Sequence, residues 1–289
     1  MLDQWLDWSL DGQLPDKKQG VFPSGRYHLY APGVLELTPN TASHAAHACI
    51  FSAAIHGNET APVELIGEWL SRLEAGSAIL GAPVLVILGN LPALKAQQRF
   101  ITTNLNRLFK RELHTEGEEP ERARILMAAV DDFYDRHSGL PKLHYDLHTA
   151  IRDSRYPRFV VEPFADSSTD AEQWDWLAAA GMQAGLHQHL KPMGALLTAL
   201  SEGHSPAHQP ASQMQFFKVQ HELIRHSDDF QLCFAEDTAN FNRFEPGTLL
   251  AQDGEAGEFR VGDTPLHVVF PNANVEVGAR AALLVAPVT

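Results

Sequence analysis

The chain has 289 residues, enough for one large domain or for a main domain with a smaller one appended. Hydrophobic residues make up 44% of it, which argues against a disordered chain. The formal net charge of -14 disfavours nucleic acid and anionic membranes as partners. The longest apolar runs fall short of the roughly 20 residues that a membrane-spanning helix needs.

The two cysteines, Cys49 and Cys233, lie far apart in the sequence, each in an apolar run. This placement favours two buried free thiols over a disulfide or a cysteine metal site. Residues 1–12 are acidic and lack the basic start and apolar core of a signal peptide. Together these features predict a protein of the reducing cytoplasm.

Strands and helices are predicted to alternate over the first 181 residues. Residues 60–74 place Val63, Ile66, Leu70 and Leu73 on one helical face, and the helix at 121–137 has Ile125, Ala128 and Phe133 among its inward candidates. The alternation predicts an α/β fold with a mixed central sheet flanked by helices, and chemistry at the carboxyl ends of its strands. The predicted strands are 47–55, 82–90, 142–149 and 158–163, and the predicted helices are 60–74, 91–97, 121–137 and 171–181.

The character of the sequence changes after about residue 190. Residues 189–213 are rich in Pro, His, Ser and Ala, which is typical of a linker after a short helix. From Met214 the pattern becomes short strands and turns, which predicts a smaller, mostly β domain. We therefore expect an α/β domain over 1–200 and a β-rich domain over 214–289, with strands at 216–224, 247–254, 257–263, 266–272 and 281–288.

A candidate metal motif, His56-Gly57-Asn58-Glu59, lies between the predicted strand 47–55 and the helix that follows it. Catalytic zinc commonly takes three nitrogen or oxygen ligands and keeps a fourth position open for water. Gly57 permits a sharp turn between the first two ligands. His148, at the end of the strand YDLHT, is the best candidate for the third ligand, and Asp146 on the same strand face is a candidate to orient it.

The same residues also have an ordinary interpretation, in which they bind no metal. A lone His-x-x-Glu is common, and the chain has 15 histidines. The joint pattern of strand, motif, helix and a second strand ending in histidine is what favours a metal site. The histidines from 187 to 226 have irregular spacings among Pro and Ser, so we expect them to be solvated rather than to form a second metal site.

Arginine and asparagine gather in GNLPALKAQQRFITTNLNRLF, residues 89–109, which contains Asn90, Arg99, Asn106 and Arg107. Arginine binds carboxylates through a bidentate fork. In an acidic protein such a cluster near a metal predicts a small anionic substrate, although ordinary surface charges would show the same pattern. Arg152, shortly after His148, is a further candidate to bind a carboxylate.

Several blocks together resemble the succinylglutamate desuccinylases of the aspartoacylase group, which is related to the zinc carboxypeptidases. The blocks are HGNETAPVELI, GNLPALKAQQRFITTNLNRLF and YDLHTAIRDSRY, with FKVQHELIRHSDDFQL, FEPGTLLAQDG and VVFPNANVEVGARAALLVAP towards the end of the chain. The resemblance covers most of the sequence. It implies a zinc carboxypeptidase-like α/β domain with a β-rich C-terminal part.

The resemblance also implies roles for single residues. His56, Glu59 and His148 match the ligands of one Zn2+, and Arg99 matches an arginine that polarises the scissile carbonyl. Asn106 and Arg107 match the pair that binds a substrate carboxylate. The implied reaction is hydrolysis of N-succinyl-L-glutamate to succinate and L-glutamate, in bacterial arginine degradation.

The sequence departs from the family pattern at two places. Asn104 stands where the family usually has Asp. The family's Thr-x-Glu-Leu-Gly-Lys motif, whose Glu activates the metal-bound water, is not found, and our hypothesis is that a segment is missing near Gly194. Glu202 is the nearest downstream glutamate, in a context typical of a helix end.

Two other functions stay open. One is a different acyl-amino-acid deacylase, aspartoacylase-like, or a carboxypeptidase-like amidase. The other is a catalytically impaired, zinc-containing binding protein for acidic metabolites, which the missing glutamate motif brings into consideration.

Overall fold

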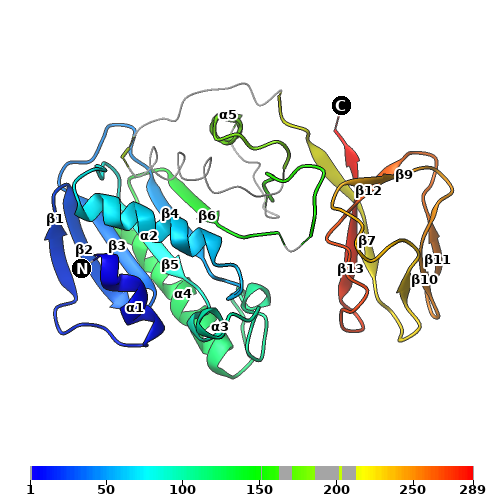
Figure 1. Cartoon of the computed structure of the whole chain (residues 1–289), viewed down its shortest axis with the longest axis horizontal. Coiled ribbons are helices and arrows are strands. Elements are labelled where there is room, and N and C mark those ends of the chain that lie inside the picture. Colours follow the sequence, from blue (N-terminus) through cyan, green and yellow to red (C-terminus); the bar gives the residue numbers. More distant parts are fainter. Residues whose placement is uncertain (1, 151, 163–170, 186–201, 204–212, 289) are drawn as a thin grey trace. The chain divides into compact units, whose positions relative to one another are not determined.

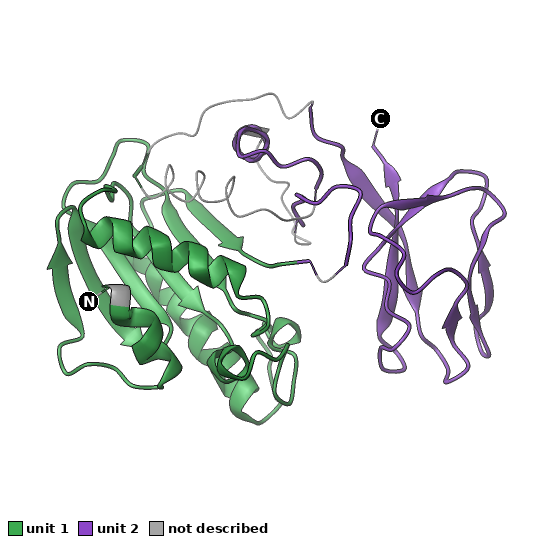
Figure 2. Ribbon diagram, viewed as in Figure 1, with its two compact units in different colours: residues 1–149, 190–208 green, residues 150–189, 209–289 purple. Residues whose placement is uncertain are grey.

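The computed structural model describes residues 2–150, 152–162, 171–185, 202–203 and 213–288 (Figure 1). The chain divides into two compact units, one formed by Met1–Thr149 with Leu190–His208 and the other by Ala150–His189 with Gln209–Thr289 (Figure 2). The domain boundaries expected from the sequence, 1–200 and 214–289, stay a prediction.

The first unit is built on one mixed sheet of six strands in the order β1-β2-β3-β5-β4-β6. β4 pairs in parallel with both β5 and β6, whereas β1, β2 and β3 join through antiparallel pairs. The predicted mixed sheet is therefore confirmed. Its strands are β1 (Gln19–Phe22), β2 (Gly25–Ala31), β3 (Val34–Pro39), β4 (Ala48–Ala53), β5 (Val84–Leu88) and β6 (Lys142–Asp146).

Helices cover both faces of this sheet, and α2 and α4 lie on opposite sides (Figure 1). Every residue of β4 and β5 is buried, which explains why these strands are continuous apolar runs. The buried face of α2 contains Val63, Ile66, Leu70 and Leu73, as predicted. The helical segments are η1 (Leu2–Gln4), α1 (Trp5–Leu10), α2 (Ala61–Glu74), α3 (Leu91–Ala96), η2 (Leu105–Arg107) and α4 (Glu118–Arg136).

The inward face of α4 was predicted wrongly in part. Phe133 is buried as expected, but Ile125 and Ala128 are exposed. Ala123 and Leu126 point inward instead, and they pack in one cluster with β4 and β5. Adjacent helical positions differ by about 100°, so a register error of one or two residues turns an inward position outward.

Two strand predictions also need correction. Strands β1 to β3 were not predicted. β2 lacks the continuous apolar run that identified β4 and β5, since it alternates buried with exposed or half-buried positions. The expected strand at 158–163 is not part of the central sheet. Phe159 there forms only an isolated bridge with Ala184, and both belong to the second unit.

The second unit is mostly β, as predicted. One sheet has the order β11-β10-β8 and the other β7-β13-β12-β9, and a cluster that includes Leu250, Val268 and Leu284 forms a core. Strands β8 and β9 were not predicted because they have only two and three residues. The elements are α5 (Ala171–Ala179), β7 (Phe217–Ile224), β8 (Gln231–Leu232), β9 (Asn242–Phe244), β10 (Leu249–Asp253), β11 (Gly257–Arg260), β12 (Leu266–Val269) and β13 (Arg280–Pro287).

Both cysteines are free thiols. Cys49 is buried, and Cys233 is half-buried rather than fully buried as expected. Among the described residues, no helix combines the length and the apolar character needed to cross a bilayer.

A buried carboxylate on β3 holds the end of α4. Glu36 is 5% exposed and accepts hydrogen bonds from Tyr30 Oη at 2.8 Å and Arg136 Nη2 at 2.6 Å, while His137 Nε2 lies 3.0 Å from its other oxygen. Burial raises the pKa of the Glu36 carboxyl, but the bonds from His137, Tyr30 and Arg136 outweigh it, so the pKa lies below its ordinary value.

We predict that Glu36→Gln destabilises the protein at pH 7 by about 1–3 kcal/mol, because an amide group cannot satisfy all three donors. A carboxyl whose pKa is lowered by folding stabilises the protein above its unfolded pKa, and this contribution is lost as the pH falls through the folded pKa. Urea unfolding of both proteins at a series of pH values, from 7 down to the lowest at which the unmodified protein is folded, measures the effect. A difference that stays constant over the whole series would contradict the role given to the charged carboxylate.

Candidate metal centre

His56 and Glu59 lie in the turn between β4 and α2. The Glu59 amide donates to the His56 carbonyl at 3.2 Å, which closes the turn. A β-carbon on Gly57 would lie only 2.0 Å from the backbone of Ala93 in α3, so a residue without a side chain is required there. Thr60 then precedes α2, which has a proline in its first turn.

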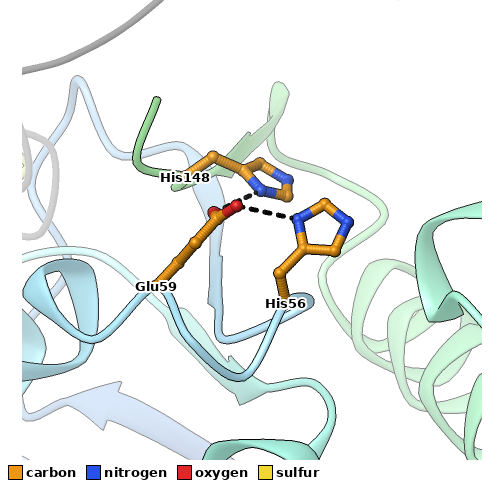
Figure 3. A group of neighbouring side chains, drawn as sticks. All are labelled: His56, Glu59 and His148. Atoms are coloured by element: carbon orange, nitrogen blue, oxygen red, sulfur yellow. Dashed lines mark hydrogen bonds and ion pairs between the residues drawn. The ribbon is translucent and has the colours of Figure 1, made fainter. Parts of the chain in front are cut away.

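His148 reaches the same place from β6. Asp146 pairs with Ser52 of β4, and the Leu147 amide continues the pairing by donating to the Ser52 carbonyl at 2.8 Å. The next residue, His148, therefore stands beside the turn that follows β4. Figure 3 shows Glu59 between the two imidazoles, with Oε1 3.0 Å from His56 Nδ1 and Oε2 2.8 Å from His148 Nδ1.

Each imidazole is held from its far side by an oxygen. His148 Nε2 lies 2.6 Å from Asp146 Oδ2, and His56 Nε2 lies 3.2 Å from Asn104 Oδ1. A proton on Nε2 that is donated to these oxygens leaves the Nδ1 lone pair free to bind a metal. Both Nδ1 atoms face Glu59, so the outer oxygens orient both rings towards a common point.

Charge is concentrated at this point. Burial raises the pKa of Glu59, but hydrogen bonds and charges from His148 and His56 outweigh it and hold the pKa well below its ordinary range. Burial lowers the pKa of His148, but Asp146 and Glu59 outweigh it and raise the pKa to about 10. The Glu59 carboxylate is therefore ionised and able to serve as an anionic ligand, and a metal ion that binds there would displace the proton from His148 Nδ1.

The donor set suits a divalent metal ion. One ligand atom from each of His56, Glu59 and His148 lies within 4.8 Å of the others, and two of these residues are buried. Two ligands of one zinc ion, each about 2.0–2.2 Å from it, lie about 4.4 Å apart at most. In the part of the chain that the structure describes, this is the one such group. His187, His189, His204 and His208 lie outside the described residues.

The predicted arginine and asparagine residues stand next to this group. Arg99 Nη1 donates to Glu59 Oε1 at 3.1 Å, which places the guanidinium at the site. Asn104 Oδ1 caps η2 by accepting from the Asn106 amide at 3.0 Å and also contacts His56. Asn106 and Arg107 are therefore tied to the metal group through η2, and the exposed Arg107 side chain is accessible to a solute.

The other residues singled out from the sequence are hydrogen-bonded to groups outside the metal group, where the structure describes them. Asn90 is buried; its side chain caps α3 and donates to Glu119 at 3.0 Å, which is a structural role. Arg152 belongs to the second unit, where it donates to the Glu236 carbonyl, and its role in substrate binding stays a prediction. Gly194, near which a missing segment is predicted, lies outside the described residues.

Glu202 is remote from the metal group. A β-carbon on Gly81 would collide with the Glu202 backbone, and Gly81 lies in the loop before β5. The metal group lies at the opposite, carboxyl ends of the parallel strands. The five residues of β5 span about 17 Å, which exceeds the reach of a glutamate side chain.

Family models and relatives agree with this architecture. The succinylglutamate desuccinylase/aspartoacylase catalytic domain matches residues 45–211, and the AstE/AspA barrel-sandwich hybrid domain matches residues 212–288. A succinylglutamate desuccinylase of Serratia proteamaculans is 34% identical over an alignment of 320 positions, covering 96% of each chain. One from Yersinia pestis is 31% identical over 323 residues, covering 98% of this chain and 96% of the relative.

Solved structures agree as well. Succinylglutamate desuccinylase from Vibrio parahaemolyticus superposes with a TM-score of 0.89 at 28% identity, covering 99% of this chain and 95% of the other. The enzyme from Vibrio cholerae superposes with a TM-score of 0.87 at 27% identity, covering 98% of this chain and 94% of the other. The fold and the site thus define an enzyme of the amidohydrolase type. The chain belongs to the succinylglutamate desuccinylase/aspartoacylase family.

The alignments also bear on the predicted missing segment. The alignment with the Serratia relative extends over 320 positions, more than the 289 residues of this chain. The relative therefore contains residues that have no counterpart here, which agrees with the hypothesis without locating the gap at Gly194.

We predict that His148→Ala abolishes stoichiometric metal retention, because it removes one of three convergent ligands. Elemental analysis after zinc loading and desalting measures this. His221→Ala is the matched control, since His221 is exposed on β7 and packs edge-on against Phe259, and the variant should retain one ion per chain. Stoichiometric zinc in His148→Ala would show that the assigned triad is wrong.

We predict that Asp146→Asn weakens metal binding by about 10- to 100-fold without abolishing it, because the His148 ring loses its charged acceptor. Competition with a chromophoric chelator measures the affinity. An affinity equal to that of the unmodified protein would mean that Asp146 does not orient His148.

Proposed function

We propose that the chain is a zinc-dependent hydrolase of a linear amide, converting N-succinyl-L-glutamate and water to succinate and L-glutamate. The observation that carries the proposal is the His56–Glu59–His148 group with Arg99 at its side, in a chain whose relatives bear the name of this activity. The proposal places the reaction in arginine degradation in the cytoplasm. It also includes a relation to the zinc carboxypeptidases.

The residues of the site have separate roles in the proposed reaction. His56, Glu59 and His148 would hold the zinc ion, which when bound supplies Lewis-acid polarisation of the amide oxygen and an acidified water. Arg99 presents its guanidinium beside Glu59, where it can stabilise negative charge that develops on the scissile carbonyl oxygen.

Substrate selection follows from local charge. The segment from residue 91 to 111 contains five basic residues and no acidic one, although the whole chain carries -14. Such a positive segment attracts a small polyanion into an otherwise acidic surface. Asn106 and Arg107, on η2 beside the metal group, would bind a substrate carboxylate, with Arg152 as a further candidate.

The general base is unassigned. The carboxylates of Glu59 and Asp146 face the imidazoles, and Glu202 is out of reach of the site. The absent family motif favours, as a second candidate, a zinc-containing binding protein for acidic metabolites that hydrolyses little or nothing. Another acyl-amino-acid deacylase, aspartoacylase-like, is the alternative within enzymes.

We predict that the zinc-loaded protein releases succinate from N-succinyl-L-glutamate, and that Arg107→Ala raises the KM for this substrate about tenfold or more. The loss of one charge-assisted hydrogen bond to a carboxylate accounts for a change of this size. Arg111→Ala is the matched control, because Arg111 is a nearby exposed arginine that pairs with Asp131 on α4.

The outcomes separate the candidate functions. Succinate release with an unchanged KM for Arg111→Ala supports the desuccinylase. Faster release of acetate from N-acetyl-L-aspartate would favour the aspartoacylase-like deacylase. Tight binding of succinylglutamate by calorimetry without turnover would favour the binding protein.

A further inference from the structure

A second buried carboxylate, Glu119, lies in the first turn of α4 and is 5% exposed. It accepts hydrogen bonds from three successive backbone amides: Ile101 at 2.7 Å on Oε1, and Thr102 at 3.0 Å and Thr103 at 2.7 Å on Oε2. The Asn90 side chain adds a fourth donor at 3.0 Å. Successive backbone amides that converge in this way form a nest for an anion, and here the anion belongs to the protein.

The amides in question belong to the segment between Arg99 and Arg107, hereafter the arginine segment. At its start, the Gly57 amide donates to the Arg99 carbonyl at 3.2 Å, and further along Leu105 is fully buried. Between these anchors, Phe100 is 39% exposed and Ile101 is 47% exposed. Hydrophobic burial therefore fixes the middle of the segment only weakly, and the Glu119 carboxylate supplies the polar attachment.

We propose that Glu119 is a positioning residue, which holds the arginine segment so that Arg99 and Arg107 stand beside the metal group. The part of this inference that concerns catalysis rests on the proposed function. The structural part, attachment of residues 101–103 by one carboxylate, stands independently of it.

Glu119 is itself held in place by the core of the first unit. Asn90 lies two residues after the end of β5. Arg122, one turn along α4, donates to the carbonyls of Leu88 at 2.6 Å and Gly89 at 2.8 Å. The start of α4 is thus hydrogen-bonded to the carboxyl end of β5. Because Glu119 lies at this fixed start of α4, its hydrogen bonds hold the arginine segment in place.

A charged carboxylate is needed for this role. Both oxygens accept from N–H groups, so an amide in either orientation would turn its own NH2 towards donors. Burial raises the pKa of Glu119, but the bonds from Thr103, Asn90, Ile101 and Thr102 outweigh it and hold the pKa below its ordinary value. The group is therefore ionised at neutral pH.

The test is Glu119→Gln in the full-length, zinc-loaded protein. We expect amide hydrogen exchange at residues 101–103 to become about tenfold faster or more, because each amide loses its charged acceptor. We also expect kcat/KM for N-succinyl-L-glutamate to fall by about 10- to 100-fold, with an increase in KM, while the zinc content stays at one ion per chain.

The matched control is Glu36→Gln. Glu36 is equally buried at 5% exposed and also accepts hydrogen bonds from α4, but at the other end of that helix, roughly 25 Å along its axis. It should lower stability while leaving exchange at 101–103 and the KM unchanged. A merely structural role for Glu119 would leave the KM unchanged in both variants.

Each result has one meaning. Unchanged exchange at 101–103 in Glu119→Gln overturns the inference. Faster exchange with an unchanged KM and kcat limits Glu119 to a structural role and overturns its positioning role. If the unmodified protein releases no succinate, the proposed function fails, and the exchange measurement together with calorimetric binding of succinylglutamate still tests the inference.

Discussion

The site depends on the parallel pairing of β4 with both β5 and β6. Parallel strands end at the same edge of a sheet, so residues far apart in the chain emerge there together. His56 follows β4, Asn90 follows β5 and His148 follows β6. The register that sets Ser52 opposite Asp146 also sets how far His148 extends towards Glu59. Hydrophobic burial of β4 and β5 therefore determines the positions of the candidate metal ligands.

Beyond the sheet edge, buried carboxylates organise the first unit. Glu59 lies between two imidazoles, Glu119 binds the amides of the arginine segment, and Glu36 secures the far end of α4. Each one is nearly inaccessible to solvent and surrounded by donors, which keeps it ionised despite burial. A carboxylate suits this purpose because it accepts several hydrogen bonds at once from segments that have few apolar contacts. The acidic composition of the chain thus includes internal groups with defined partners, in addition to surface charge.

The sequence predicted the parts of the fold that local patterns encode. Continuous apolar runs identified β4 and β5, and the histidine motif between a strand and a helix identified His56 and Glu59. The remaining features depend on tertiary contacts, which local sequence patterns do not encode. The face of α4 was misjudged at Ile125 and Ala128 because Ala123 and Leu126 fit the sheet instead. Glu119 has no local signature, since its role arises only where the arginine segment folds back onto α4. Asn90 resembled a binding residue because it lies at a strand end, but its side chain is fully used within the core.

The groups of the candidate metal centre are distinct from the general base, which is unassigned. His56, Glu59 and His148, with the oxygens of Asn104 and Asp146 behind the two rings, all come from segments fixed by β4, β6 and η2. Arg99 and Arg107 are fixed by the same unit through Glu59, Asn104 and the attachment to Glu119. Among the described residues, all of these contacts lie between residues 56 and 148. Under the proposed function, loss of a base carried on the stretch where the family motif is not found would leave the candidate metal ligands and carboxylate-binding residues in place while slowing hydrolysis. Metal content and substrate affinity report on the part of the site described here, and turnover reports in addition on the general base, which is unassigned.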